Sequence, residues 1–267
     1  MKSLFFIGAG KMAGAIAGGL VSSGACSPDE IGAFDPSPQA AEKFSAATGI
    51  SVSEKSAADG INECSTILIA VKPQVITEAL APYRDMLKDK LIISIAAGIT
   101  IARLQELTGS EHIIRVMPNT PALVGKGASA YACSSKISDG EIAIAEKILK
   151  SVGISMNLNE KDLDAVTALS GSGPAYVFEF IQALADGGVA EGLSRDTALR
   201  LAAQTVAGAA EMVIKTGEHP VALKDKVTSP AGTTSRALEV LAAKGFGGIV
   251  INAVRAATAR SKELGKN

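Results

Sequence analysis

A cluster of hydroxyl side chains near the C-terminal end is the first part of this sequence that could do chemistry. Residues 228–235 read TSPAGTTS and lie between apolar stretches that have the composition of helices. Pro230 and Gly232 interrupt any continuous helix there, so hydroxyl and backbone N–H groups stand together without bulky neighbours. Such groups can exchange hydrogen bonds with a small ligand. The alternative is an ordinary loop between two helices, in which Ser and Thr serve as caps.

A glycine-rich run at the other end of the chain could bind a phosphate-containing ligand. Residues 7–14 read IGAGKMAG, which fits the pattern G-x-G-x-x-G/A, and they directly follow the apolar run 4–7. After a strand and before a helix, this pattern binds dinucleotides. Gly8 permits the tight turn, Gly10 lets the backbone approach a pyrophosphate, and Ala13 allows the helix to pack closely on the strand. The alternative is a glycine-rich turn that holds no ligand.

Two charged residues follow predicted strands at positions where a dinucleotide would lie. Asp35 ends the second strand, 21 residues beyond Gly14, where a carboxylate commonly bonds the adenosine ribose. A carboxylate there repels a 2′-phosphate, which argues for tolerance of NAD(H). The alternative is that Asp35 begins the turn Asp-Pro-Ser-Pro. Lys72 follows the central strand at the edge where ligands bind, and its alternative is a solvated surface charge.

The elements that must position these residues follow two different patterns along the chain. Up to about residue 157, short apolar runs alternate with helical stretches, which predicts a doubly wound, mostly parallel α/β sheet. The predicted strands cover residues 4–7, 31–34, 66–71, 91–95 and 113–117, and the predicted helices include 11–23 and 38–47. Beyond residue 160 only helices are predicted, over 175–191, 197–215, 234–243 and 247–264. We therefore expect a Rossmann-like dinucleotide-binding domain at 1–159 and an all-α domain at 160–267.

Composition argues against several classes of protein. A formal net charge of −1 without blocks of like charge disfavours nucleic acid or an anionic membrane as partner. No apolar run in the sequence reaches the roughly 18 residues needed to span a bilayer. Three scattered cysteines and two histidines show no metal-ligand spacing, so no metal is expected, and the thiols suit a reducing cytoplasm. Helices in the second half are apolar around much of their circumference, which predicts a homodimer or larger assembly.

Taken together, motifs along essentially the whole chain resemble those of pyrroline-5-carboxylate reductase, the last enzyme of proline biosynthesis. The shared stretches are IGAGKMAGAIAGGL from residue 7, AVKPQ at 70–74, SIAAG at 94–98, RVMPNTPALVGKG at 115–127, LSGSGPAYVFEF at 169–180 and TSPAGTT at 228–234. The first motif occurs in many dehydrogenases, whereas MPNTP, SGSGPAY and TSPAGTT in this order are far more specific.

The resemblance implies NAD(P)H-dependent reduction of the cyclic imine Δ1-pyrroline-5-carboxylate to L-proline, and it assigns site residues by position. The implied cofactor contacts are Ile7, Gly8, Ala9, Gly10, Lys11, Met12, Asp35, Ala70, Val71, Lys72, Pro73, Ala97, Met117, Asn119 and Thr120. The implied substrate contacts are Glu160, Ser229, Gly232, Thr233 and Thr234. Two departures leave the choice between NADP and NAD open. Ser56-Ala57-Ala58 stands where many relatives carry an Asn, and Asp35-Pro36-Ser37 stands where many carry Ser or Asn-Arg-type residues.

The implied reaction explains the hydroxyl cluster. A small anionic imine needs N–H donors for its carboxylate, and a helix that begins near Thr234 would supply them. The imine nitrogen is basic enough to be protonated before hydride transfer, so no strongly tuned acid is required. We therefore predict that Thr234, contributed by the partner subunit of a dimer, bonds the ring nitrogen and relays its proton. Ser170 and Ser172 can equally serve as caps of the following helix.

Two rival functions are less consistent with the sequence. A β-hydroxyacid dehydrogenase shares the two-domain plan but places a catalytic Lys on the first helices after the nucleotide domain, and residues 170–188 contain no Lys. A non-catalytic nicotinamide-binding sensor would need no substrate loop, so TSPAGTT speaks against it. The sequence does not determine whether dimers assemble further into a ring.

Overall fold

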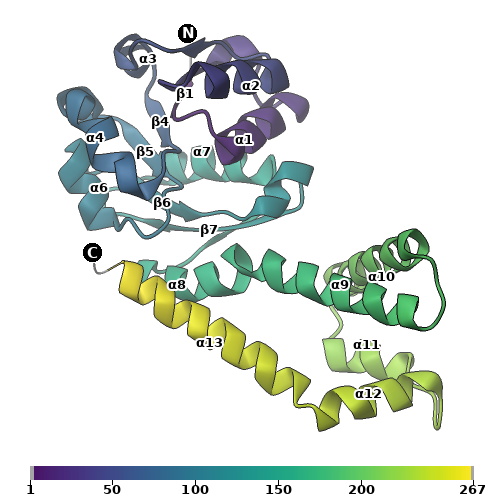
Figure 1. The fold of residues 1–267 in the computed structure, drawn as a ribbon. Helices are drawn as coiled ribbons and strands as arrows, with labels where there is room; N and C mark the ends of the chain where they lie inside the picture. The colour runs from purple at the N-terminus through teal and green to yellow at the C-terminus, as the bar shows by residue number, and fades with distance from the viewer. Residues whose placement is uncertain (1–2, 266–267) are drawn as a thin grey trace. The chain divides into compact units, whose positions relative to one another are not determined.

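Short apolar runs form one eight-stranded sheet in the computed structural model, which describes residues 3–265 (Figure 1). The strands follow the order β3-β2-β1-β4-β5-β6-β7-β8. All neighbouring pairs run parallel except β6 and β7, so the predicted doubly wound, mostly parallel sheet is confirmed. The strands are β1 (Leu4–Ile7), β2 (Ile31–Phe34), β3 (Val52–Ser53), β4 (Thr66–Ile69), β5 (Leu91–Ser94), β6 (Ile113–Met117), β7 (Gly127–Cys133) and β8 (Gly153–Asn157).

Helices cover both faces of the sheet, because its central strands are apolar on both sides. Every residue of β1, β4 and β5 is buried. One core, which includes Phe6 and Leu149, lies between the sheet and three helices: α1 (Lys11–Ser22), α2 (Pro38–Thr48) and α7 (Asp139–Lys150). The core on the other face includes Ile67 and lies under five shorter helices: α3 (Ala58–Glu63), α4 (Ile76–Leu80), α5 (Arg84–Leu87), α6 (Ile101–Thr108) and α8 (Leu163–Val166).

Some predicted strand boundaries were wrong, and three strands were not predicted at all. β4 and β5 end at Ile69 and Ser94 rather than at 71 and 95. The Ala70 N–H still donates to the carbonyl of Ile7, and the chain then leaves the sheet. β3, β7 and β8 escaped prediction; β7 reads GASAYAC, whose small side chains give little periodic signal. Its place beside β6 is set by tertiary pairing rather than by local preference.

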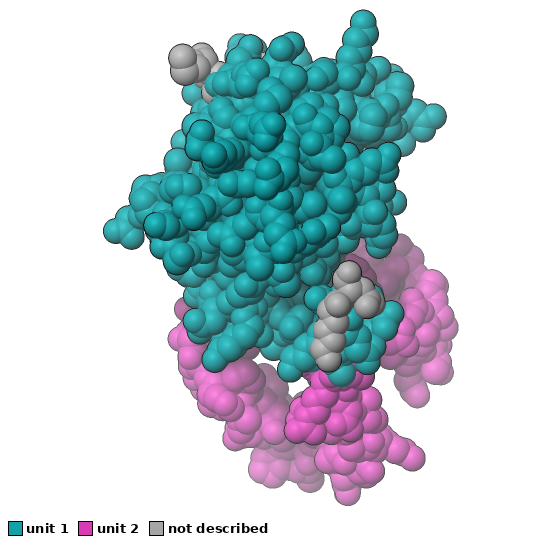
Figure 2. All heavy atoms as spheres, turned by 90° about the vertical axis from the view of Figure 1, so that its left-hand side faces the viewer, with its two compact units in different colours: residues 1–172, 257–267 teal, residues 173–256 magenta. Residues whose placement is uncertain are grey.

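The chain divides into two compact units, which Figure 2 colours separately. The first contains the sheet and consists of residues up to 172 together with those from 257 onward, and the second covers 173–256. The helices of the second half are α9 (Gly173–Ala190), α10 (Arg195–Thr216), α11 (Pro220–Lys226), α12 (Thr233–Ala243) and α13 (Phe246–Leu264). The all-α character of the second half is thus confirmed. The functional division at 159/160 stays a prediction.

Residue types at the ends of α10 explain its length. The Ser194 hydroxyl accepts a hydrogen bond from the Thr197 N–H at the N-terminus. Gly217, in the left-handed conformation with φ +65°, ends the helix. Among the described residues, no single helix is long and apolar enough to cross a membrane; α12 and α13 meet that criterion only as a pair bent by 51°.

The helices of the second unit bury little of their own apolar surface. The core they share is built on alanines. Large apolar side chains elsewhere in this unit are exposed, among them Phe178 (64%), Ile214 (76%) and Ile249 (62%). Exposed apolar surface of this kind marks an interaction site.

Candidate functional site

The carboxyl ends of five strands meet at one edge of the sheet. β1, β2, β4, β5 and β6 run parallel, so their carboxyl ends lie side by side, where open α/β sheets bind their ligands. The predicted cofactor residues end these strands, follow them closely or open α1: Ile7, Gly8, Ala9, Gly10, Lys11, Met12, Asp35, Ala70, Val71, Lys72, Pro73, Ala97, Met117, Asn119 and Thr120. The structure therefore brings the whole predicted set to one edge.

The glycine turn after β1 has the geometry of an anion cradle. Gly8 has φ +101°, and a Cβ added there would lie 2.8 Å from the Ala70 carbonyl oxygen, so only glycine fits. Gly10 caps α1 without a side chain, and a Cβ added to it would meet nothing within 4 Å. Because no side chain caps this 12-residue helix, the N–H groups of its first turn are available to an anion, which the helix dipole favours. The turn fits the pyrophosphate of a dinucleotide.

Asp35 joins the glycine turn to the turn that follows β2. Its Oδ2 accepts a hydrogen bond from the Ala9 N–H at 2.8 Å, and its Oδ1 accepts one from the Ser37 N–H at 2.9 Å. The second bond is the local turn that the sequence offered as an alternative role for Asp35. The first bond fixes the carboxylate beside the cradle. Contact with a ribose stays a prediction.

An apolar cavity of about 550 Å³ opens beside the glycine turn, at the ends of β1, β2 and β4. Its lining includes Phe34, Val71 and Tyr83, and the rings of Phe34 and Tyr83 meet edge to face with centroids 6.3 Å apart. Asp35 and Lys72 also line it. An apolar cavity with a carboxylate in its lining suits the adenosine end of a dinucleotide.

A second cavity, of about 870 Å³, lies within the first unit beyond β4 and β5. Its lining includes Pro73, Ala97, Thr100 and Arg103. Asp35, the predicted ribose contact, follows β2 on one side of β1, so a dinucleotide bound across the glycine turn would extend its other end past β4 toward β5 and β6. The predicted contacts at Ala97 and Met117 are at that end of the edge.

The hydroxyl cluster forms a strained turn followed by a helix that no side chain caps. The Gly232 N–H donates to the Ser229 carbonyl at 3.1 Å and closes a turn with Pro230 and Ala231 at its centre. Ala231 has φ +58° and is the one non-glycine residue with a positive φ among residues 3–265. That conformation costs an L-residue about 1–2 kcal/mol, and strained residues of this kind recur at functional sites. The strained conformation of Ala231 was not predicted from the sequence.

The helix α12 begins at Thr233, one residue earlier than predicted, with Gly232 as its N-cap. Because no side chain caps this end, its first-turn N–H groups are available to an anion. The structure therefore brings Ser229, Gly232, Thr233 and Thr234 together in one turn, as the sequence predicted.

Glu160 belongs to the first unit and is engaged there. Its Oε1 accepts hydrogen bonds from the Ile101 N–H at 2.7 Å and from Arg115 Nη1 at 2.9 Å. The Arg115 side chain is only 11% exposed. These bonds tie Glu160 to the first turn of α6 and to β6. This structural role was missed at the level of sequence, because partners 59 and 45 residues away leave no local signal. The substrate contact stays a prediction.

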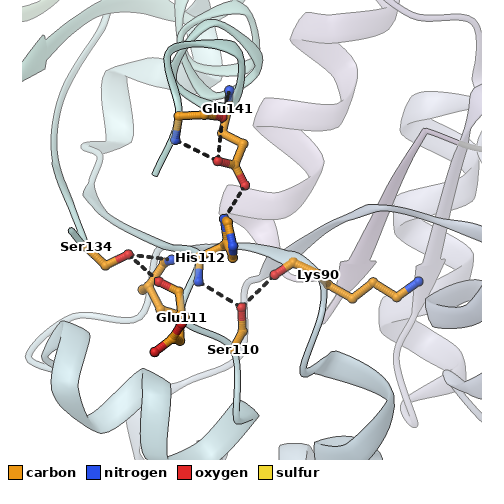
Figure 3. Close-up of polar contacts among 8 residues, drawn as sticks. Lys90, Ser110, Glu111, His112, Ser134 and Glu141 are labelled. Carbon is orange, nitrogen blue, oxygen red and sulfur yellow. Dashed lines mark hydrogen bonds and ion pairs between the residues drawn. The ribbon is translucent and has the colours of Figure 1, made fainter. Parts of the chain in front are cut away.

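A polar network at the opposite edge of the sheet has a structural role (Figure 3). His112 Nδ1 lies 2.7 Å from Glu141 Oε1. The Ser134 hydroxyl accepts a hydrogen bond from the Ile113 N–H at 3.0 Å and donates to the Glu111 carbonyl at 2.6 Å. These groups precede β6 or follow the antiparallel β7, which places them away from the candidate site. Across residues 3–265, no group of three or more His, Cys, Asp or Glu could hold a metal ion.

Glu141→Gln should weaken the start of α7 in a pH-dependent way. Burial alone would raise the pKa of Glu141, but hydrogen bonds from Ser138 and the nearby His112 outweigh it, so the pKa lies below the usual 4.5. The carboxylate therefore contributes stability that is present above pH 4.5 and lost as the pH falls through its lower folded-state pKa. Urea denaturation should find the variant about 1 kcal/mol less stable at about pH 7, and this difference should be smaller at about pH 3. An equal loss at both pH values would contradict this role for the charge.

Comparison with known proteins identifies one family for the whole chain. Residues 160–264 match the family profile described as pyrroline-5-carboxylate reductase dimerisation, and residues 3–98 match NADP oxidoreductase coenzyme F420-dependent. The pyrroline-5-carboxylate reductase of Arabidopsis thaliana is 46% identical over 263 residues, which cover 98% of this chain and 95% of the relative.

Solved structures agree with the sequence relatives. A pyrroline-5-carboxylate reductase from Coxiella burnetii superposes with a TM-score of 0.92 at 34% identity, over 98% of each chain. A pyrroline carboxylate reductase from Plasmodium falciparum, solved with NADP bound, superposes with a TM-score of 0.88 at 37% identity, over 99% of this chain and 98% of that one. With this identity and coverage, and with the glycine cradle and hydroxyl turn in place, the chain belongs to the pyrroline-5-carboxylate reductase family.

Proposed function

We infer that this chain catalyses the NAD(P)H-dependent reduction of Δ1-pyrroline-5-carboxylate to L-proline, the last step of proline biosynthesis. The observation that carries the inference is the turn at 228–235. It presents hydroxyl groups and an uncapped helix N-terminus in a chain that is similar over its full length to enzymes of that name. A non-catalytic nicotinamide-binding protein has no need of such a turn.

The cofactor residues act by holding a dinucleotide at the carboxyl edge. The N–H groups at the start of α1 would bind its pyrophosphate, and Asp35 would lie beside its ribose. Either NADP or NAD suits this cradle, and a bound reduced nicotinamide supplies the hydride. No metal is required for the reaction we propose.

The turn at 228–235 binds the substrate. N–H groups at the start of α12 hold its carboxylate, and the Ser229 and Thr233 hydroxyls add donors. The Thr234 hydroxyl bonds the ring nitrogen and relays the proton that makes the iminium ion. Glu160 is proposed as a further substrate contact. In this scheme residues 1–159 hold the cofactor and residues 160–267 bind the substrate and form the dimer.

We propose that the active form is a homodimer in which the turn at 228–235 comes from the partner subunit. The exposed apolar side chains of α9, α10 and α13, such as Phe178, Ile214 and Ile249, support this assembly, as does the match of residues 160–264 to a dimerisation profile. Sedimentation equilibrium should give at least twice the 27.1 kDa of one chain, and a higher even multiple would indicate a ring of dimers. A monomer at micromolar concentration would contradict the assembly.

We propose that the enzyme works in the cytoplasm. Cys26, Cys64 and Cys133 form no disulfide with one another, which suits a reducing compartment.

The experiment that tests the reaction follows absorbance of NADH and NADPH separately, at equal concentrations, in the presence of purified protein and pyrroline-5-carboxylate. Oxidation of either with formation of proline is the expected result. Binding of the reduced cofactor without oxidation would overturn the catalytic proposal and favour a nicotinamide-binding sensor instead.

A further inference from the structure

The side chain of Asn119 is a buried amide that joins three segments of the first unit. The residue is 8% exposed. Its Oδ1 accepts a hydrogen bond from the Ala128 N–H at 2.8 Å, and its Nδ2 donates to the Ser170 carbonyl at 3.1 Å. The orientation of the amide is fixed, because a backbone N–H can only donate and a carbonyl can only accept.

The third of these segments is a turn of π-helix, Thr167–Gly171, whose last two residues, Ser170 and Gly171, begin the motif SGSGP. The Ser172 N–H donates to the Thr167 carbonyl at 2.8 Å and closes the turn. Turns of this kind are rare and often occur at functional sites. The Asn119 amide therefore ties the turn to the loop that follows β6 and to the start of β7. The sequence left the role of the motif SGSGP undecided. The π-helical turn gives Ser170 and Gly171 of this motif a structural role.

Met117 packs against this turn. A Cβ added to Gly171 would lie 2.5 Å from Met117 Cε, so the methionine methyl group occupies the space that glycine leaves. Met117 ends β6 at the carboxyl edge of the sheet and is only partly buried. With the adenosine end beside Asp35, which follows β2, the nicotinamide end of a bound dinucleotide would extend toward β5 and β6. The Met117 side chain is thus held at the end of the edge where hydride transfer would occur.

We propose that Asn119 is a positioning residue for hydride transfer, and that it acts through the π-helical turn and Met117 in place of the direct cofactor contact that the resemblance implies. This proposal rests on the proposed function. The amide holds the Ser170 carbonyl, the turn holds Gly171 against the Met117 methyl group, and Met117 limits the positions open to the nicotinamide. Binding of the adenosine and pyrophosphate does not depend on the hydrogen bond between Asn119 and Ser170.

Asn119→Asp is the variant that tests the proposal. The carboxylate still accepts from the Ala128 N–H but presents an oxygen to the Ser170 carbonyl, so the turn is released. We expect kcat per folded protein to fall about tenfold to a hundredfold, because a small misplacement of reacting groups is costly. The primary deuterium isotope effect on kcat, measured with C4-deuterated NADPH, should increase. The Kd for NADPH, from its fluorescence, should stay within about threefold of the parent value.

Ser134→Ala is the matched control, since Ser134 is also buried and also bonds two backbone groups, but at the opposite end of β6 (Figure 3). It should lower the melting temperature while kcat per folded protein and the isotope effect stay unchanged.

Gly171→Ala is the variant to measure if Asn119→Asp does not fold. It keeps both hydrogen bonds of Asn119 and displaces the Met117 methyl, so kcat should fall in the same way.

Wild-type kcat and isotope effect in folded Asn119→Asp, or in Gly171→Ala, would overturn the proposal, and so would an equal loss of kcat in Ser134→Ala. Failure of the proposed function itself would look different. In that case the parent protein would bind NADPH but would oxidise neither NADH nor NADPH with pyrroline-5-carboxylate.

Discussion

Replacing Thr234 with alanine is expected to lower kcat/KM for pyrroline-5-carboxylate by about a hundredfold, with the affinity for reduced cofactor unchanged. The hydroxyl is proposed to bond the imine nitrogen and relay its proton, and methyl alone can do neither. Thr234 is the second residue of α12. Loss of the Thr234 hydroxyl should leave the fold intact, because the N-terminus of α12 is formed with Gly232 as N-cap. The substitution should lower kcat as well as raise KM, since proton transfer precedes hydride transfer.

Two further variants make the Thr234 result interpretable. Thr234→Ser retains a hydroxyl and should recover most of the activity. Thr228→Ala removes a hydroxyl of the same turn that donates to the Lys224 carbonyl at 2.7 Å, and it should lower stability slightly with kcat/KM preserved. A loss of less than about threefold in Thr234→Ala, roughly 0.6 kcal/mol, would remove Thr234 from the mechanism and leave backbone N–H groups as the main substrate contacts.

Replacing Gly10 with alanine should raise the KM for NADH and NADPH by about thirtyfold without changing the melting temperature. An added Cβ meets no protein atom within 4 Å, so the fold accepts it, yet it stands where the pyrophosphate must approach the backbone. Loss of one charge-assisted hydrogen bond, about 2 kcal/mol, accounts for that factor.

The neighbouring glycines provide the controls. At Gly14 an added Cβ would make only ordinary contact, 3.8 Å from the Phe44 ring, so Gly14→Ala should keep its KM and gain about 0.5–1 kcal/mol of helix stability. At Gly8 the added Cβ would collide with Ala70, so Gly8→Ala should lose stability even without cofactor. Unchanged KM in Gly10→Ala would mean that the pyrophosphate is held elsewhere.

Features encoded by local pattern could be predicted from the sequence. β1, β2 and β6 lie where their apolar runs predicted, because strands covered on both faces are nearly continuous apolar runs in the sequence. The left-handed Gly217 and the Ser194 cap are likewise residue types with a strong local preference for a helix end. The glycine cradle was predictable for the same reason, since its function depends on the absence of side chains.

Features that depend on contacts between distant residues could not be predicted from the sequence. The pairing of β7 with β6 and β8, the engagement of Glu160 by Arg115 and the clamp made by Asn119 all join residues far apart in the chain. Ala231 is a different case. A left-handed alanine contradicts its own local preference and is held there by the turn around it, so preference alone argued against it.

The antiparallel direction of β7 provides a site for chemical attachment that is away from the candidate functional site. Because β7 runs against β6, its C-terminal end and the exposed Ser135 and Lys136 emerge at the edge away from the glycine cradle. A dye coupled there, a surface tether or an inserted peptide would be carried by the sheet without entering either cavity. The turn at 135–136 is therefore the natural attachment point for immobilising the enzyme or for reporting on its assembly while it works.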